Sequence, residues 1–206
     1  MSNSGFKKTL VLSPHTDDGE LGAGGTIAKL IESGSEICYF AFSAPKARLK
    51  EECRKSLKVL GVTHYEIFDV KVRLFPSQRQ KILDILFEYN EKNQVDLVLT
   101  PSTNDLHQDH QTVTNEALRI FKESTILGYE LPWNLIDFKE NCFVPLKEQH
   151  VKKKINALWN YESQIQAKRP YFNEKYLKSL MLAHGLKIRK KYAEAFEAIK
   201  LVLNEF

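Results

Sequence analysis

The chain has 206 residues, of which 43% are hydrophobic and 27% charged, a composition typical of one globular domain. A domain of this size buries about 70% of the surface that its unfolded chain exposes, so it needs neither disulfides nor a structural metal to stay folded. The formal net charge of +4 is too small to indicate a polyanionic partner, and we expect no nucleic acid to bind.

The cysteines and the opening of the chain predict a cellular compartment. The three cysteines, Cys38, Cys53 and Cys142, are odd in number and lack Cys-x-x-Cys spacing, as is typical of reduced, mostly buried thiols. Residues 1–5 are polar and lack the apolar core of a signal peptide, and no window approaches the ~20 apolar residues that span a bilayer. We therefore expect a cytoplasmic protein with no membrane partner.

Strands and helices are predicted to alternate through the first part of the chain. Short apolar runs predict strands at residues 10–12, 36–43, 64–69 and 95–100. Apolar residues three and four positions apart predict helices at residues 26–32, 46–60, 77–93 and 110–122, with Ser77 as an N-cap and Gly61 as a stop. Such alternation requires right-handed crossovers and gives a parallel sheet covered on both faces. The predicted fold is an α/β, Rossmann-like three-layer sandwich with a mostly parallel central sheet.

The later part of the chain is less regular. We expect strands at residues 126–131 and around Phe143, and helices at residues 149–166 and 173–184. The apolar pattern of residues 192–203 fits either a helix or a strand. No internal repeat, low-complexity tract or Gly/Ser linker marks a second domain, so a single domain over residues 1–206 is expected.

Charged side chains crowd the segment that follows the first predicted strand. His15, Asp17 and Asp18 lie there, and the glycine-rich residues 22–25 predict a loop that folds back before the next helix. Carboxylates at the end of a buried strand must be paired, protonated or bound to a cation. The cluster therefore indicates a metal site that still needs a ligand.

A second polar loop follows the strand at residues 95–100 and contains His107 and His110. In open α/β sheets, ligands bind outside the carboxyl ends of the strands, so loops that follow two parallel strands can meet in one crevice. His15, Asp18 and His110 could meet there as a triad of two histidines and one carboxylate.

Both loops carry motifs of a known family. Residues 14–25 read Pro-His-Thr-Asp-Asp and then Leu-Gly-Ala-Gly-Gly, and residues 107–110 read His-Gln-Asp-His. These motifs resemble the LmbE-like, or PIG-L, family of zinc-dependent N-acetylglucosaminide deacetylases, and residues 154–164 and 192–196 are also similar to patterns of its bacterial members. The resemblance implies the LmbE-like fold and favours a strand for residues 192–203.

The resemblance also implies a ligand set and a general base. His15, Asp18 and His110 would hold the metal, and three protein ligands leave a position for water, as in catalytic zinc sites. Asp17 would take a proton from that water. Zinc is favoured by the resemblance alone, because two histidines and one carboxylate with open positions also describe ferrous iron sites.

The family resemblance also implies roles for the remaining residues of the motifs. His107 resembles a histidine that stabilises the oxyanion or protonates the leaving amine. Asp109 would orient His107, since a carboxylate on one ring nitrogen fixes the tautomer and favours the imidazolium. Asp105 stands where some members have a tyrosine that assists the carbonyl, so this assistance is expected to be absent or to come from elsewhere.

The implied reaction is the hydrolysis of an acetamide to acetate and a free amine. The expected partner is a small acetamido sugar such as N-acetylglucosamine, with nucleotide-linked and glycoside-linked forms both open. The alternatives are a hydrolase of another acyl amide or ester, and a non-catalytic sugar-binding protein that retains its metal. Residues 44–48, 70–76 and 132–143 are expected to choose the substrate, although no single contact residue can be named. A homo-oligomer stays open.

Overall fold

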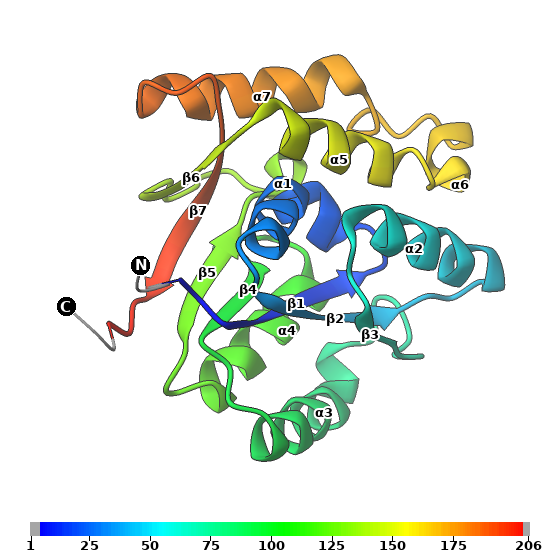
Figure 1. Ribbon diagram of the computed structural model, residues 1–206. Helices are drawn as coiled ribbons and strands as arrows, with labels where there is room; N and C mark the ends of the chain where they lie inside the picture. The colour runs from blue at the N-terminus through cyan, green and yellow to red at the C-terminus, as the bar shows by residue number, and fades with distance from the viewer. Residues whose placement is uncertain (1–4, 204–206) are drawn as a thin grey trace.

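The central sheet has seven strands, and the computed structural model that contains it describes residues 5–203 (Figure 1). Residues 1–4 of the polar opening lie outside the described range. The strands are β1 (Lys8–His15), β2 (Glu36–Ser43), β3 (His64–Ile67), β4 (Leu97–Pro101), β5 (Thr125–Tyr129), β6 (Cys142–Leu146) and β7 (Tyr192–Lys200). Their order across the sheet is β3-β2-β1-β4-β5-β7-β6, with the first five parallel and β7 antiparallel to both of its neighbours. The mostly parallel sheet is confirmed.

Helices cover both faces of the sheet, which confirms the Rossmann-like three-layer sandwich (Figure 1). One face carries α1 (Asp18–Glu32) and α2 (Ala47–Leu60), with α5 (Glu148–Leu158) packed against both, while α7 (Glu174–Lys187) packs on β7. The other face carries α3 (Arg79–Lys92) and α4 (Gln108–Ile120). The short elements are α6 (Glu162–Gln166) and the 3₁₀ turns η1 (Pro76–Gln78) and η2 (Pro132–Asn134). Within residues 5–203, no helix is long and apolar enough to cross a bilayer.

The core has two halves because successive side chains of a strand point to opposite faces. In β1, Leu10 and Leu12 pack with α3 and α4, whereas Val11 packs with α1, α2 and α5, and all three are fully buried. Each such side chain contributes about 1.5–3 kcal/mol when it leaves water. This burial on both faces explains why β1 reads as an unbroken apolar run.

Two expectations, one from a local signal and one from the family resemblance, are confirmed. Helix α2 ends at Leu60, and Gly61 adopts φ = 93°, the left-handed conformation that glycine tolerates at the end of a helix. The ambiguous segment at residues 192–203 contains strand β7. All three cysteines are free, and Cys38 and Cys53 are buried.

The glycine-rich residues 22–25 form a helix, so the predicted loop is wrong. Helix α1 begins at Asp18 and runs through them. A Cβ at Gly22 would lie 2.3 Å from Cδ2 of Tyr129, and one at Gly25 would lie 2.5 Å from Cδ1 of Leu146. The glycines therefore let α1 approach β5 and β6 closely, and this packing outweighs their weak intrinsic helix preference.

The predicted helix at residues 149–166 is also wrong in one respect, because it divides into α5 and α6. Tyr161 lies at the division and is fully buried, and its hydroxyl donates to the carbonyl oxygen of Thr16 and to Glu20.

The prediction that Ser77 is an N-cap is wrong. Helix α3 begins at Arg79, and the Ser77 hydroxyl donates to a carbonyl oxygen in the preceding turn.

We predict that Gly22→Ala lowers the free energy of unfolding by about 1–3 kcal/mol, because the new methyl group overlaps the buried Tyr129 ring. Helix propensity alone would favour alanine by about 1 kcal/mol. Urea denaturation measures the difference. The control is Gly5→Ala, where no atom lies within 4 Å of the new Cβ. A Gly22→Ala protein as stable as the wild type would contradict the packing explanation.

Candidate metal centre and active site

The candidate site lies at the carboxyl ends of β1 and β4, where the order of the strands reverses. Strand β1 ends at His15 and leads directly into the start of α1 with Asp17 and Asp18. Strand β4 leads through a short loop to His107, and His110 lies in the first turn of α4. The two segments meet, and Nδ1 of His15 lies 3.3 Å from Nε2 of His110.

Three donor atoms form a small triangle at this point. Nδ1 of His15 lies 3.0 Å from Oδ2 of Asp18, and Nε2 of His110 lies 3.2 Å from the same oxygen. The third side is the 3.3 Å between the two nitrogens. Ligands of a tetrahedral zinc ion are separated by about 3.3 Å when the bonds are about 2.0 Å long. The donor set therefore fits a small divalent cation.

The second nitrogen of each histidine is held by a buried carboxylate. Nε2 of His15 lies 3.1 Å from Oδ2 of Asp109, and Nδ1 of His110 lies 2.7 Å from Oδ2 of Asp105. Histidines that ligate metals almost always donate their other N–H in this way, which leaves the facing nitrogen free for the ion. Asp105 is thus a site residue whose role the sequence did not reveal.

The carboxylates make this a site for positive charge. Burial lowers the pKa of His15, but the charge of Asp18 and the hydrogen bonds to Asp109 and Asp18 outweigh burial and raise it to about 10. Burial likewise lowers the pKa of His110, and Asp18 and Asp105 raise it to about 9. Protons therefore occupy both rings at neutral pH when no other cation is present. A metal ion would supply the same positive charge and displace these protons.

Asp17 does not belong to the set of carboxylates that contact His15 and His110. It is half-buried at the start of α1, and its side chain does not cap the helix. Burial and the charge of Asp18 raise the pKa of Asp17 to about 7. A carboxyl group with such a pKa can take up and release a proton near neutral pH.

The predicted contact between Asp109 and the His107 ring is wrong. The Asp109 carboxylate binds His15 and accepts the backbone N–H of Arg73 at 2.7 Å. Only the backbone N–H of Asp109 reaches His107, donating to Nδ1 at 3.2 Å, because His107 is the N-cap of α4. Because Nδ1 of His107 accepts this hydrogen bond, the proton of the neutral ring lies on Nε2.

The surroundings of His107 disfavour the expected imidazolium. Burial and the positive charges of His110 and His15 lower the pKa of His107. Its ring stacks on His110 with 4.5 Å between the centroids and meets the edge of His15 at 5.0 Å. Nitrogens of the three histidines lie within 4.8 Å of one another, so a three-histidine metal site is an alternative. The shorter distances to Asp18 favour the triangle described above.

A buried carboxyl group holds the backbone beside Asp17. Glu20 is fully buried and accepts hydrogen bonds from the hydroxyls of Tyr39, Tyr161 and Ser56. Both tyrosines also donate to the carbonyl oxygen of Thr16, the residue before Asp17. These contacts fix the turn from β1 into α1, and no local pattern could have revealed the contribution of Tyr161, which lies far along the chain between α5 and α6.

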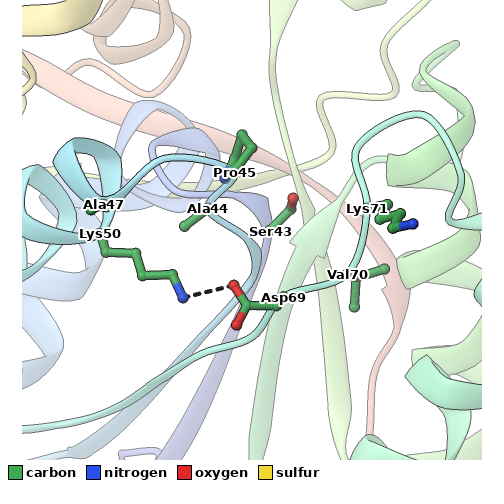
Figure 2. Close-up of a pocket in the computed structure, with 8 residues that line it drawn as sticks. All are labelled: Ser43, Ala44, Pro45, Ala47, Lys50, Asp69, Val70 and Lys71. Carbon is green, nitrogen blue, oxygen red and sulfur yellow. Dashed lines mark ion pairs between the residues drawn. The ribbon is translucent and has the colours of Figure 1, made fainter.

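A cavity of about 410 Å³ lies beside the site (Figure 2). Ser43 lines it and is paired with His15 across β1 and β2, so the cavity adjoins the histidines without including them in its wall. Lys50 and Asp69 form an ion pair of 2.7 Å in this wall. The other lining residues are Ala44, Pro45, Ala47, Val70 and Lys71. Two segments expected to choose the substrate, residues 44–48 and 70–76, thus contribute to one cavity.

Comparison with known proteins identifies relatives along most of the chain. The chain is 28% identical to the uncharacterized deacetylase YaiS of Escherichia coli (strain K12) over 76% of this chain and 91% of that protein. It is 26% identical to the diacetylchitobiose deacetylase of Thermococcus kodakarensis, over 94% and 83% of the respective chains.

Solved structures share the fold. The N,N'-diacetylchitobiose deacetylase of Pyrococcus horikoshii, solved with its inhibitor MPG, matches with a TM-score of 0.73 and 23% identity, covering 93% of this chain and 83% of its own. The sequence model of the PIG-L family, described as GlcNAc-PI de-N-acetylase, matches residues 10–121, which is more than half of the chain and includes both histidine loops. The chain therefore belongs to the PIG-L family.

Proposed function

We propose that this protein is a zinc-dependent N-deacetylase that hydrolyses the acetamide of an N-acetylglucosamine-type sugar or glycoside and releases acetate. The observation that carries the proposal is the triangle of His15, Asp18 and His110 donor atoms, 3.0–3.3 Å apart, with Asp17 adjacent to Asp18 in the chain and within reach of its charge. Membership of the PIG-L family and the relative named as a diacetylchitobiose deacetylase support the choice of substrate.

His15, Asp18 and His110 would hold the metal. Zinc bound there supplies Lewis acidity that polarises a carbonyl group and lowers the pKa of water to about 7. Asp105 and Asp109 keep the two histidine rings oriented, since each accepts from the ring nitrogen that faces away from the triangle.

Asp17 acts as the general base and accepts a proton from the attacking water. Because its pKa is raised to about 7, the carboxyl group can then return that proton to the departing amine. This assignment differs from the expected role of His107 as the acid, since the lowered pKa of His107 disfavours the protonated ring.

His107 donates a hydrogen bond in this scheme. Its Nδ1 accepts from the backbone, so Nε2 carries the proton and is available to the carbonyl oxygen of the substrate as negative charge develops there. A neutral donor of this kind also supplies the assistance that some relatives obtain from a tyrosine at the position of Asp105.

The direct test of the function incubates the purified protein with a panel of N-acyl and O-acyl sugars and measures the acetate that is released. Metal-free protein is reconstituted with zinc or, without air, with ferrous ion before the assay. We expect zinc-dependent release from N-acetyl sugars. Release from O-acetyl compounds alone would show an esterase, and saturable sugar binding without turnover would show a binding protein.

We predict that Asp17→Asn lowers kcat by about 10²–10⁴-fold, the usual contribution of a general base, while the bound metal remains. Steady-state kinetics and metal analysis on the same sample measure both quantities. The control is Asp84→Asn, an exposed carboxylate on α3. An Asp17→Asn enzyme with undiminished kcat would exclude Asp17 as the base.

We predict that Asp105→Asn weakens zinc binding by about 10–100-fold, because His110 loses the carboxylate that orients its ring. Competition with a chromophoric chelator measures the affinity, again with Asp84→Asn as the control. An unchanged zinc affinity would show that Asp105 does not support the metal ligand.

A further inference from the structure

Glu197 is a buried carboxylate on β7 that the proposed mechanism does not use. It is 4% exposed and accepts three hydrogen bonds from two consecutive residues. Oε2 accepts from the Ser102 hydroxyl and from the backbone N–H of Thr103, both at 2.8 Å, and Oε1 accepts from the Thr103 hydroxyl at 2.7 Å. Burial raises the pKa of Glu197, but the hydrogen bonds from Thr103 and Ser102 outweigh burial and lower it. The carboxylate is therefore ionised at neutral pH, and hydrogen bonds to a charged acceptor are stronger than neutral ones.

A glycine in the neighbouring strand lets these two residues reach Glu197. Glu197 is paired with Gly128 across β7 and β5, which lie side by side in the sheet (Figure 1). Ser102 directly follows β4, and its backbone N–H donates to the carbonyl oxygen of Tyr129 at 3.0 Å. A Cβ at Gly128 would lie 2.8 Å from Cα of Ser102. A side chain at position 128 would therefore displace the backbone of Ser102 from its place beside Glu197.

The residues that Glu197 holds begin the loop between β4 and α4. The carbonyl oxygen of Ser102 accepts the backbone N–H of Asp105 at 3.1 Å. Oδ2 of Asp105 lies 2.7 Å from Nδ1 of His110, and Oδ1 of Asp105 accepts the backbone N–H of His107 at 2.8 Å. A continuous path of hydrogen bonds therefore leads from Glu197 to the candidate metal ligand His110.

We propose that Glu197 is a positioning residue for the metal centre. It holds the start of the β4–α4 loop in the arrangement in which Asp105 orients the ring of His110 toward the ion. This inference rests on the proposed function, because the ion is the zinc proposed there. Glu197 lies on the last strand, about 90 residues after His110, so no local motif includes it.

A second buried carboxylate separates positioning from simple stabilisation of the fold. Glu52 is 5% exposed and accepts both the backbone N–H and the hydroxyl of Ser163, much as Glu197 does from Thr103. The contacts of Glu52 join α2 to α6. Glu52→Ala therefore removes a carboxylate with similar contacts without loosening the loop between β4 and α4.

The first test measures zinc binding. We expect Glu197→Ala to weaken it by about three- to tenfold, less than Asp105→Asn, because Glu197 acts through Asp105. Glu197→Gln should keep most of the affinity, since an amide can retain all three contacts if the Thr103 hydroxyl accepts in place of donating. Glu52→Ala should lose stability in urea and keep the zinc affinity of the wild type. Competition with a chromophoric chelator measures the affinity, and the absorption of the cobalt-substituted protein reports the coordination geometry.

Ser102→Ala is a milder change that tests the same path. It removes one of the three donors and leaves the carboxylate of Glu197 in place. We expect it to weaken zinc binding less than Glu197→Ala does. Combined with Glu197→Ala it should weaken binding no further, because the two residues act through one contact. If Glu197→Ala does not fold, the same criteria apply to Ser102→Ala.

Amide hydrogen exchange in the metal-free protein tests the loop without the ion. The N–H groups of Asp105 and His107 donate to Ser102 and Asp105, so Glu197 does not bond them directly. We expect both amides to lose protection in Glu197→Ala, while the amide of Val98 in β4 keeps its protection.

The outcomes separate this inference from the proposed function. Zinc binding by the wild type with an unchanged affinity in Glu197→Ala would overturn the role of Glu197 and leave the proposed function. Equal weakening by Glu52→Ala would also overturn that role, because the effect would then follow from stability alone. Lost protection at Asp105 and His107 in a protein that binds no zinc would support Glu197 as the residue that holds the loop and would contradict the proposed function.

Discussion

The crowding of carboxylates at the carboxyl ends of β1 and β4 is the constraint on which the site depends. Asp18, Asp105 and Asp109 are all nearly or fully buried, and each lies within hydrogen-bond distance of His15 or His110. Like charges in such a space must be balanced, because burial makes uncompensated charge very costly. Protons on the two histidines balance them in part, as the raised pKa values show. A divalent cation within the triangle would neutralise the charge of the carboxylates and would also supply the Lewis acidity for the proposed hydrolysis.

The scaffold around this cluster is built to hold α1 against the sheet. Gly22 lets the helix lie on Tyr129, and the hydroxyl of Tyr129 donates to the carbonyl oxygen of Leu12 in β1. Glu20 and its tyrosine partners fix the turn between the strand and the helix. Asp18 is therefore placed by the packing of α1 as well as by the backbone N–H of His15, which donates to its carboxylate at 2.8 Å. Such rigidity suits a site whose ligands must keep their positions to within about 0.5 Å.

The sequence predicted what depends on local pattern and missed what depends on distant partners. The strands that precede His15 and His107, and the end of α2 at Gly61, follow from apolar runs and from glycine chemistry. The helical conformation of the glycine-rich segment could not be predicted, because the side chains that require glycine there come from β5 and β6. The partner of Asp109 was missed for a similar reason: the backbone of Arg73 and the ring of His15 surround its carboxylate only in the folded chain. Motif spacing identifies reactive residues but not which neighbour each one contacts.

The central claim is that the two loops share one ion, and anomalous diffraction at the zinc absorption edge tests it most directly. Crystals grown with zinc should give one strong peak about 2.0–2.2 Å from Nδ1 of His15, an oxygen of Asp18 and Nε2 of His110. The His107 ring should lie next to the peak without ligating it. A peak coordinated by His107 in place of Asp18, or no peak between the two loops, would contradict the account.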